Sequence, residues 1–181
     1  MRDVDRPLTT APADGASPRP QQLRPPRHRV SPRAIRYWTA RALAGWLVLA
    51  AAQVAFMVVA HDDLQRWHLV ALAVTVVVAA AHLAVMPQWR YRVHRWEATA
   101  SAVYTQAGWF SQERRIAPIS RIQTVDTQRG PLEQLFGLSN VTITTASAAG
   151  PLKIHGLDRE LAQTLVDDLV RAAELTRGDA T

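Results

Sequence analysis

Two long apolar stretches, separated by one short polar segment, constrain this chain more than any other feature of its sequence. The first stretch covers residues 43–60 and the second covers residues 69–86, and neither contains a charged residue. A bilayer core is about 30 Å thick, so a helix of roughly 20 mainly apolar residues spans it. Each stretch meets the lower end of that range, and Trp67 and His68 can extend the second. We therefore expect a transmembrane helical hairpin over residues 31–89, with spans at about 43–60 and 67–86.

Two core helices of a soluble bundle are the alternative reading of these stretches. Such helices normally show a polar face. The polar side chains within the two stretches are Gln53, Thr75 and His82, and they form no stripe. A cleaved signal peptide is not expected, because the first apolar run begins only at residue 43 and a second run follows it.

The placement of arginine predicts the orientation of the hairpin. Six arginines lie between residue 24 and the first span, and three more follow the second span within residues 90–95. The connector holds Asp62, Asp63 and a single arginine, Arg66. Cytoplasmic flanks of membrane helices collect Lys and Arg. The sequence therefore predicts a multi-pass protein of the inner or plasma membrane with both termini in the cytoplasm.

The distribution of charge argues against a nucleic-acid-binding protein, although the net charge is +6. The first 96 residues hold thirteen arginines against five acidic residues, whereas residues 97–181 hold eight basic and ten acidic residues. Nucleic-acid-binding modules need a basic face, and here the excess charge flanks the membrane. The chain has no cysteine, which excludes disulfides, thiolate zinc sites and thiol catalysis.

The N-terminal segment differs from the rest in composition. Residues 1–30 are rich in proline, arginine and small residues and poor in large apolar ones, so they are predicted to form a disordered tail. Ser31 and Pro32 then form the signature of a helix start, with serine as the cap and proline at the first helical position.

Residues 90–178 predict a strand-rich domain that ends in a helix. Alternating or β-branched residues, with glycine and proline as punctuation, mark its strands. The predicted strands cover residues 91–96, 102–107, 109–116, 124–129, 141–145 and 152–154. In the third of these, Trp109 and Phe110 are the large anchors. Asp158 is predicted to cap a helix that runs to about Thr176. Its expected apolar face consists of Leu161, Leu165, Val166, Leu169, Val170 and Ala173.

Within this domain, a set of turn residues and apolar residues resembles the bacterial pleckstrin-homology-like membrane-flanked domain of YdbS-like proteins. The resemblance rests on Gly108 and on three segments, residues 118–125, 131–138 and 141–146. It extends over roughly residues 35–175, including the preceding hairpin. Its motif residues, taken as structural, are Gly108, Pro118, Ile119, Arg121, Ile122, Pro131, Leu132, Phe136, Gly137 and Leu138.

The resemblance implies an α+β membrane protein. The two-helix hairpin is followed by a cytoplasmic pleckstrin-homology-like antiparallel barrel or bent sheet, which the C-terminal helix closes. The family implies no catalytic activity and no defined functional residues.

The motif itself is interpreted as structural. Gly137 is expected to adopt a positive φ or to allow a close backbone approach. Leu132, Leu135 and Phe136 are expected to plug one end of the barrel. Arg121 and Gln123 form either a polar binding patch or the solvated face of a strand.

The sequence shows no catalytic, nucleotide-binding or metalloprotease motif, and we expect no cofactor and no metal. His61 and His68 flank the acidic connector, where a solvated cluster is favoured over a metal site. His82 lies within the second span, where a hydrogen bond to the neighbouring helix is favoured over a proton relay. Residues 97–101 contain no Lys or Arg, which argues against inositol-phosphate binding through that loop.

The leading interpretation is a non-enzymatic membrane protein that presents an interaction domain to the cytoplasm. Its expected partners are the lipid bilayer and either a second copy of the chain or a related membrane-flanked protein. A small oligomeric transport or channel component, built around the polar residues of the spans, is one alternative, and a lipid-recognition module is another. An enzyme using Asp126, His155 and Asp158 is a further alternative that no motif supports.

Overall fold

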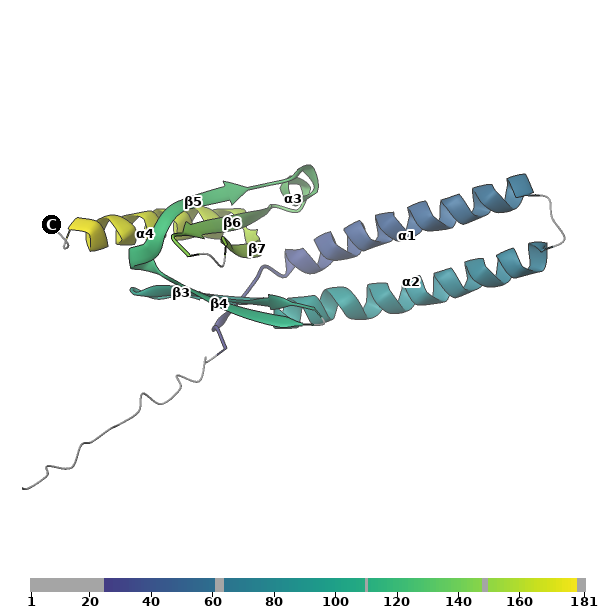
Figure 1. Cartoon of the computed structure of the whole chain (residues 1–181). Coiled ribbons are helices and arrows are strands. Elements are labelled where there is room, and N and C mark those ends of the chain that lie inside the picture. Colours follow the sequence, from purple (N-terminus) through teal and green to yellow (C-terminus); the bar gives the residue numbers. More distant parts are fainter. Residues whose placement is uncertain (1–24, 61–63, 110, 148–149, 179–181) are drawn as a thin grey trace, which may run out of the picture.

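The computed structural model describes residues 25–60, 64–109, 111–147 and 150–178 of the chain, and shows a long helical hairpin attached to a strand-rich domain (Figure 1). Helix α1 (Arg33–Ala60) and helix α2 (Gln65–Val93) run side by side in opposite directions. The two predicted spans lie inside these helices. Their connector at residues 61–63, with His61, falls outside the described residues.

The two helices of the hairpin present their apolar side chains outward. Each helix contains an 18-residue apolar window, and no residue of either window is buried within the protein. Val48 is 71% exposed and Val77 is 68% exposed. Because water is a poor solvent for such a surface and lipid is a good one, the exposure fits two membrane-spanning helices.

The first sheet of the domain contains four antiparallel strands in the order β1-β2-β3-β4. Their bounds are β1 (His28–Arg29), β2 (Arg95–Ala98), β3 (Ala102–Gly108) and β4 (Gln112–Pro118). Strands β3 and β4 form a hairpin in which Gly108 is paired with Gln112. Gly108 has a φ of 132°, and a Cβ atom there would overlap the carbonyl oxygen of Ser111.

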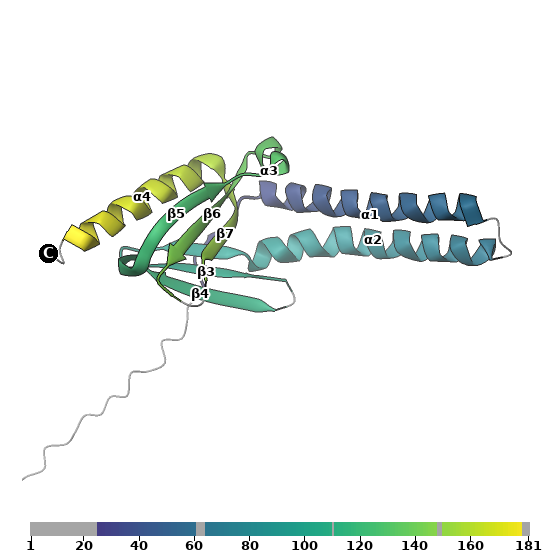
Figure 2. The same cartoon turned by 45° about the horizontal axis from the view of Figure 1, so that its top comes forward.

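The second sheet contains three antiparallel strands in the order β5-β6-β7. The chain reaches it through the short 3₁₀ helix η1 (Ile119–Arg121) and continues as β5 (Ile122–Gln128), α3 (Pro131–Leu135), β6 (Leu138–Thr145) and β7 (Leu152–Asp158). The final helix, α4 (Arg159–Gly178), lies across this sheet (Figure 2).

The core of the domain lies between the two sheets and beneath α4. The buried residues come from both sheets, from α4 and from the first turns of α1. They include Ala34, Trp38, Val103, Ala117, Leu138, Val141, Ile143, Ile154, Leu157, Ala162, Leu165 and Leu169. The start of α1 is thus part of the domain core, whereas the rest of the helix is not.

Two predictions about element boundaries near the hairpin differ from the structure. Residues 28–29 of the predicted tail form β1, because they pair with Trp96 and Arg95 of β2. Residues 1–24 lie outside the described part of the chain. The predicted strand at residues 91–96 begins as helix: α2 continues to Val93, and the His94 amide donates to the Arg90 carbonyl. Pro87 lies inside α2, where it is buried and does not end the helix.

The predicted barrel is not closed. Within the described residues β4 and β5 belong to separate sheets, because η1 turns the chain between them. The expected apolar plug is also incomplete, since Leu132 is 46% exposed and Leu135 is 77% exposed. On α4, Leu161 and Val170 were expected on the apolar face, but both are exposed. Ala162 is buried instead of Leu161.

Candidate functional site at the junction of helices and sheets

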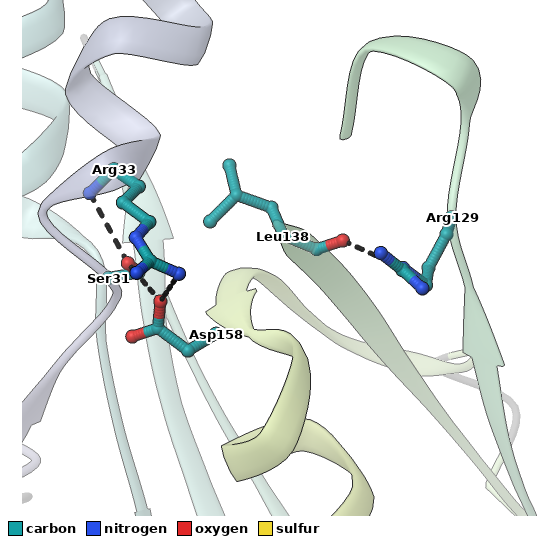
Figure 3. A network of polar contacts seen from close by, with 5 residues as sticks. All are labelled: Ser31, Arg33, Arg129, Leu138 and Asp158. Carbon is teal, nitrogen blue, oxygen red and sulfur yellow. Dashed lines mark hydrogen bonds and ion pairs between the residues drawn. The ribbon is translucent and has the colours of Figure 1, made fainter. Parts of the chain in front are cut away.

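The residues that join the hairpin to the domain form a network around Asp158, at the end of β7 (Figure 3). The Ser31 hydroxyl donates to Asp158 Oδ1 at 2.8 Å, and Arg33 Nη1 lies 3.3 Å from the same oxygen. The Arg33 amide donates to Ser31 Oγ at 3.2 Å, so Ser31 caps α1 as predicted. Asp158 directly precedes α4, and its carboxylate pairs with the start of α1.

A second group of contacts ties α3 to α1 and β6. The Glu133 carboxylate accepts hydrogen bonds from the Tyr37 hydroxyl at 3.2 Å, from Asn140 Nδ2 at 2.7 Å and from the Gly130 amide. Burial raises the pKa of Glu133, but the three hydrogen bonds and nearby His155 outweigh burial and lower it overall. The ionised carboxylate is therefore the form that holds the junction together.

Two glycines allow the backbone of the domain to approach α1 closely. Gly156 has a φ of 76°, and a Cβ atom there would lie 3.1 Å from the Cβ of Ala34. Gly137 has a φ of 67°, and its Cβ would lie 3.2 Å from Arg33 Nη1. In β7, His155 and Gly156 together lie opposite Asn140 of β6, which makes a β-bulge.

Two histidines lie on the inner side of the junction. His94 is buried, and burial lowers its pKa to about 4. Its Nδ1 lies 2.8 Å from the Arg90 carbonyl oxygen, so this nitrogen carries the proton of the neutral ring. The His94 ring also packs on Trp38, with centroids 5.3 Å apart. Burial, helped by Arg90 and Lys153, likewise lowers the pKa of His155.

A cleft of about 660 Å³ opens beside the Asp158 network. It is lined by Ser31, Arg33, Arg36, Gly137, Asp158 and Arg159, among others. Because Arg33 is paired with Asp158, the charges along its wall partly cancel. The cleft lies where the start of α1, the end of β7 and the start of α4 meet.

The motif residues lie along the corners of the domain. Pro118 ends β4, and Pro131 begins α3. Ile119, the first residue of η1, and Ile122, the first residue of β5, are buried. Phe136 packs edge-on against Tyr37, with centroids 6.2 Å apart. Leu138 is fully buried. The remaining motif residue, Arg121, is exposed, as is Gln123.

Two of the residues considered for catalysis make hydrogen bonds within the fold. Asp126 accepts a hydrogen bond from Thr124, and Asp158 is bonded to the start of α1. No group of three potential metal ligands occurs within the part of the chain that the structure describes. Within the spans, His82 Nδ1 accepts a hydrogen bond from Trp46 Nε1 at 2.9 Å, the inter-helix contact that the sequence analysis favoured.

Sequence analysis missed Gly156, Asn140 and His94 as junction residues. An isolated glycine within a strand signals a bulge or a close backbone approach, so Gly156 could have been found. Asn140 accepts from the Gly156 amide at 3.0 Å through Oδ1. That contact depends on the register between β6 and β7, which the sequence does not reveal.

Comparison with known proteins agrees with this arrangement. The family model described as "Bacterial PH domain" matches residues 37–173. The chain belongs to the bacterial PH domain family. The matched region begins in α1, so the hairpin and the PH-like domain are matched together.

A curated relative supports the same assignment. The UPF0699 transmembrane protein YdbS of Bacillus subtilis (strain 168) is 39% identical over 74 residues. The aligned region covers 41% of this chain and 45% of YdbS, so this bacterial PH domain protein matches less than half of that relative's length. No solved structure gives a significant match. With its two apolar helices, the chain is a transmembrane protein with a PH-like domain.

Proposed function

We propose that this protein is a non-enzymatic membrane scaffold whose PH-like domain pairs with a second copy through residues 123–128 of the edge strand β5. The observation that carries the proposal is the open edge itself. Strand β5 has β6 on one side and no strand on the other among the described residues. Unpaired strand edges are templates for pairing with another chain.

Strand β4 is an edge strand of the first sheet and β5 is an edge strand of the second. A comparison of the two supports β5 as the docking edge. Strand β4 carries Glu113, Arg114, Arg115 and a terminal Pro118, the residue types that protect strand edges from pairing. Strand β5 carries a single charged residue, Asp126, and no proline. Most of its side chains are exposed, and α4 packs beside it.

The polar residues of the spans give less support to a transport function. Gln53 Nε2 donates to Thr75 Oγ1 at 2.9 Å, and Trp46 donates to His82. These side chains therefore bond across the hairpin, which favours a role in holding α1 against α2. A lipid-recognition function through charge has little support, because residues 97–181 contain more acidic than basic residues.

Disulfide cross-linking in the full-length protein tests the β5 edge, because the chain has no native cysteine. Single cysteines would replace, in turn, the exposed residues Gln123, Thr124, Asp126, Thr127 and Gln128, and the proteins would be oxidised in native membranes. In antiparallel self-pairing, residues near the two-fold axis face their own copies about 5 Å apart. We expect a cross-linked dimer at one or two neighbouring positions.

Cysteines at Glu113, Arg114 and Ile116 of β4 are the matched controls and should stay monomeric. A monomeric full-length protein, or equal cross-linking at β4 and β5, would contradict the proposal. Cross-linking of β5 to a different bacterial PH domain protein would instead identify a related membrane-flanked partner.

The proposed orientation places both termini and the PH-like domain in the cytoplasm. It is supported by the arginines that flank the spans, such as Arg33, Arg36 and Arg41. A cysteine at Gln65 should react with an impermeant maleimide on intact cells, whereas one at Thr127 should react only after lysis. The reverse pattern would put the domain on the outer face.

A further inference from the structure

The tip of the β3–β4 hairpin touches α2. The Trp109 carbonyl accepts a hydrogen bond from Trp89 Nε1 at 3.0 Å. The Trp109 ring lies edge-on to His82, with centroids 6.4 Å apart and an interplanar angle of 79°. Even with these contacts, the Trp109 side chain is 53% exposed.

The contact with His82 fixes the depth of the tip relative to the bilayer. His82 lies four residues before Met86, the last residue of the second apolar stretch. At 1.5 Å per helical residue, it lies about 6 Å inside the end of that stretch. The partly exposed ring of Trp109 therefore reaches the level at which the apolar stretch meets the headgroups.

A second apolar group lies beside α1. Figure 1 shows α3 next to the first turns of α1, and Figure 2 shows the end of the β3–β4 hairpin beside α2. Tyr37 holds α3 in place through Phe136 and Glu133. Leu132 and Leu135 remain 46% and 77% exposed, although α3 is fixed.

We propose that Trp109 and the two leucines of α3 are lipid contacts that seat the PH-like domain on the bilayer spanned by α1 and α2. The occupant of this surface is the interfacial region of that bilayer, since Trp109 packs on His82 inside the second apolar stretch and α3 is held beside Tyr37, ahead of the first stretch. Tryptophan is enriched at this depth because its ring is amphipathic. The described residues of the tip, Gly108, Trp109 and Ser111, carry no charge that would oppose entry. This contact is independent of pairing at β5.

The depth of the tip can be measured in the full-length protein in phosphatidylcholine nanodiscs. A cysteine at Ser111 would carry an environment-sensitive NBD dye, and a cysteine at Ala100 would be the control. Both residues are exposed, and they flank opposite ends of β3. We expect the Ser111 dye to emit at shorter wavelength, to be quenched several-fold more by doxyl-labelled lipid, and to be protected from iodide.

Equal quenching by lipid at Ser111 and Ala100 would overturn the proposal. A Ser111 dye protected from iodide but not quenched by lipid would also overturn it, since the tip would then be covered by protein. Trp109→Ser, combined with the Ser111 dye, should restore iodide quenching, whereas Ile116→Ser on β4 should not. If iodide quenching of the Ser111 dye does not change in Trp109→Ser, Trp109 does not contribute to the lipid contact.

The α3 contact has its own pair of labels. A dye at Leu135 should be quenched by doxyl-labelled lipid more than a dye at Gln163, which is exposed on α4. A Leu135 dye that iodide quenches as strongly as the Gln163 dye would overturn the α3 contact.

Discussion

The hairpin and the PH-like domain use the same apolar residue types in opposite ways. In the domain, Val141, Ile143 and Leu157 are 0% exposed and pack between the sheets and α4. In the hairpin, Val48 and Val77 face outward. The domain is held together by exclusion of water from its core. The hairpin needs lipid as its solvent, and its helices are joined by a few polar contacts and close packing.

Helix α1 belongs to both regions and shows where one environment gives way to the other. Trp38 is 4% exposed and packs in the domain core, whereas Leu47, less than three turns later, is 59% exposed. The consequence is that a substitution in one helix should have effects that depend on its position along that helix. Three predictions test this contrast, from the largest expected effect to the smallest.

Acidification should destabilise the domain through His94. Its pKa is about 4 in the folded protein against 6.5 for an unperturbed histidine, so only the unfolded chain takes up a proton as the pH falls below 6.5. Unfolding should become easier by about 1.4 kcal/mol per pH unit, or roughly 3 kcal/mol by pH 4. Denaturant titrations from pH 7 to pH 4.5 on full-length protein and on His94→Gln measure this difference.

In that comparison His94→Gln should lose much of the pH dependence. His28→Gln, at an exposed position of β1, is the control and should keep it. Parallel pH curves for all three proteins would show that His94 is protonated as readily in the folded domain as in the unfolded chain.

Gly156→Ala should destabilise the junction by about 1–3 kcal/mol, because alanine strains at a positive φ and its Cβ would crowd Ala34. Gly45→Ala, in the membrane part of α1, has no neighbour within 4 Å of the added Cβ and should cause no such loss. Thermal unfolding of both variants in the same detergent measures the difference. Equal melting temperatures would mean that α1 does not pack against β7.

The smallest effect is expected for the polar pair within the spans. The hydrogen bond between Gln53 and Thr75 should contribute about 0.6 kcal/mol, the typical value between membrane helices. A double-mutant cycle with Gln53→Leu and Thr75→Val isolates this interaction. A coupling energy of several kcal/mol would contradict this prediction, because the pair would then stabilise the hairpin as strongly as a core contact stabilises the domain.

Much of the fold follows from local patterns. The apolar stretches predicted the helices, and β-branched residues such as Val141 and Ile143 predicted β6. The boundary at residues 91–96 could not be predicted, because alternating apolar and basic residues fit the end of α2 as well as a strand. Strand β1 was missed for another reason: it forms only through pairing with β2, and the Arg27 amide donates to Glu97, 70 residues away.

The candidate site was less predictable than the fold. Gly137 and Ser31 were found because a glycine after a helical turn and a Ser-Pro pair have local signatures. The junction histidine His94 had none, since its low pKa comes from burial in the folded protein. Leu132 and Leu135 were predicted to fill a barrel end, but with the sheets left open they remain on the surface.

The hairpin is an insertion within the domain, with both of its ends held by the same body. Strand β1 and the Ser31–Asp158 contact fix the chain just before α1, and β2 fixes it just after α2. A change in the angle between the two helices would therefore be transmitted to β7 and to the first sheet. A tilt of one helix against the other would strain the hydrogen bonds that Ser31 and Arg33 make to Asp158.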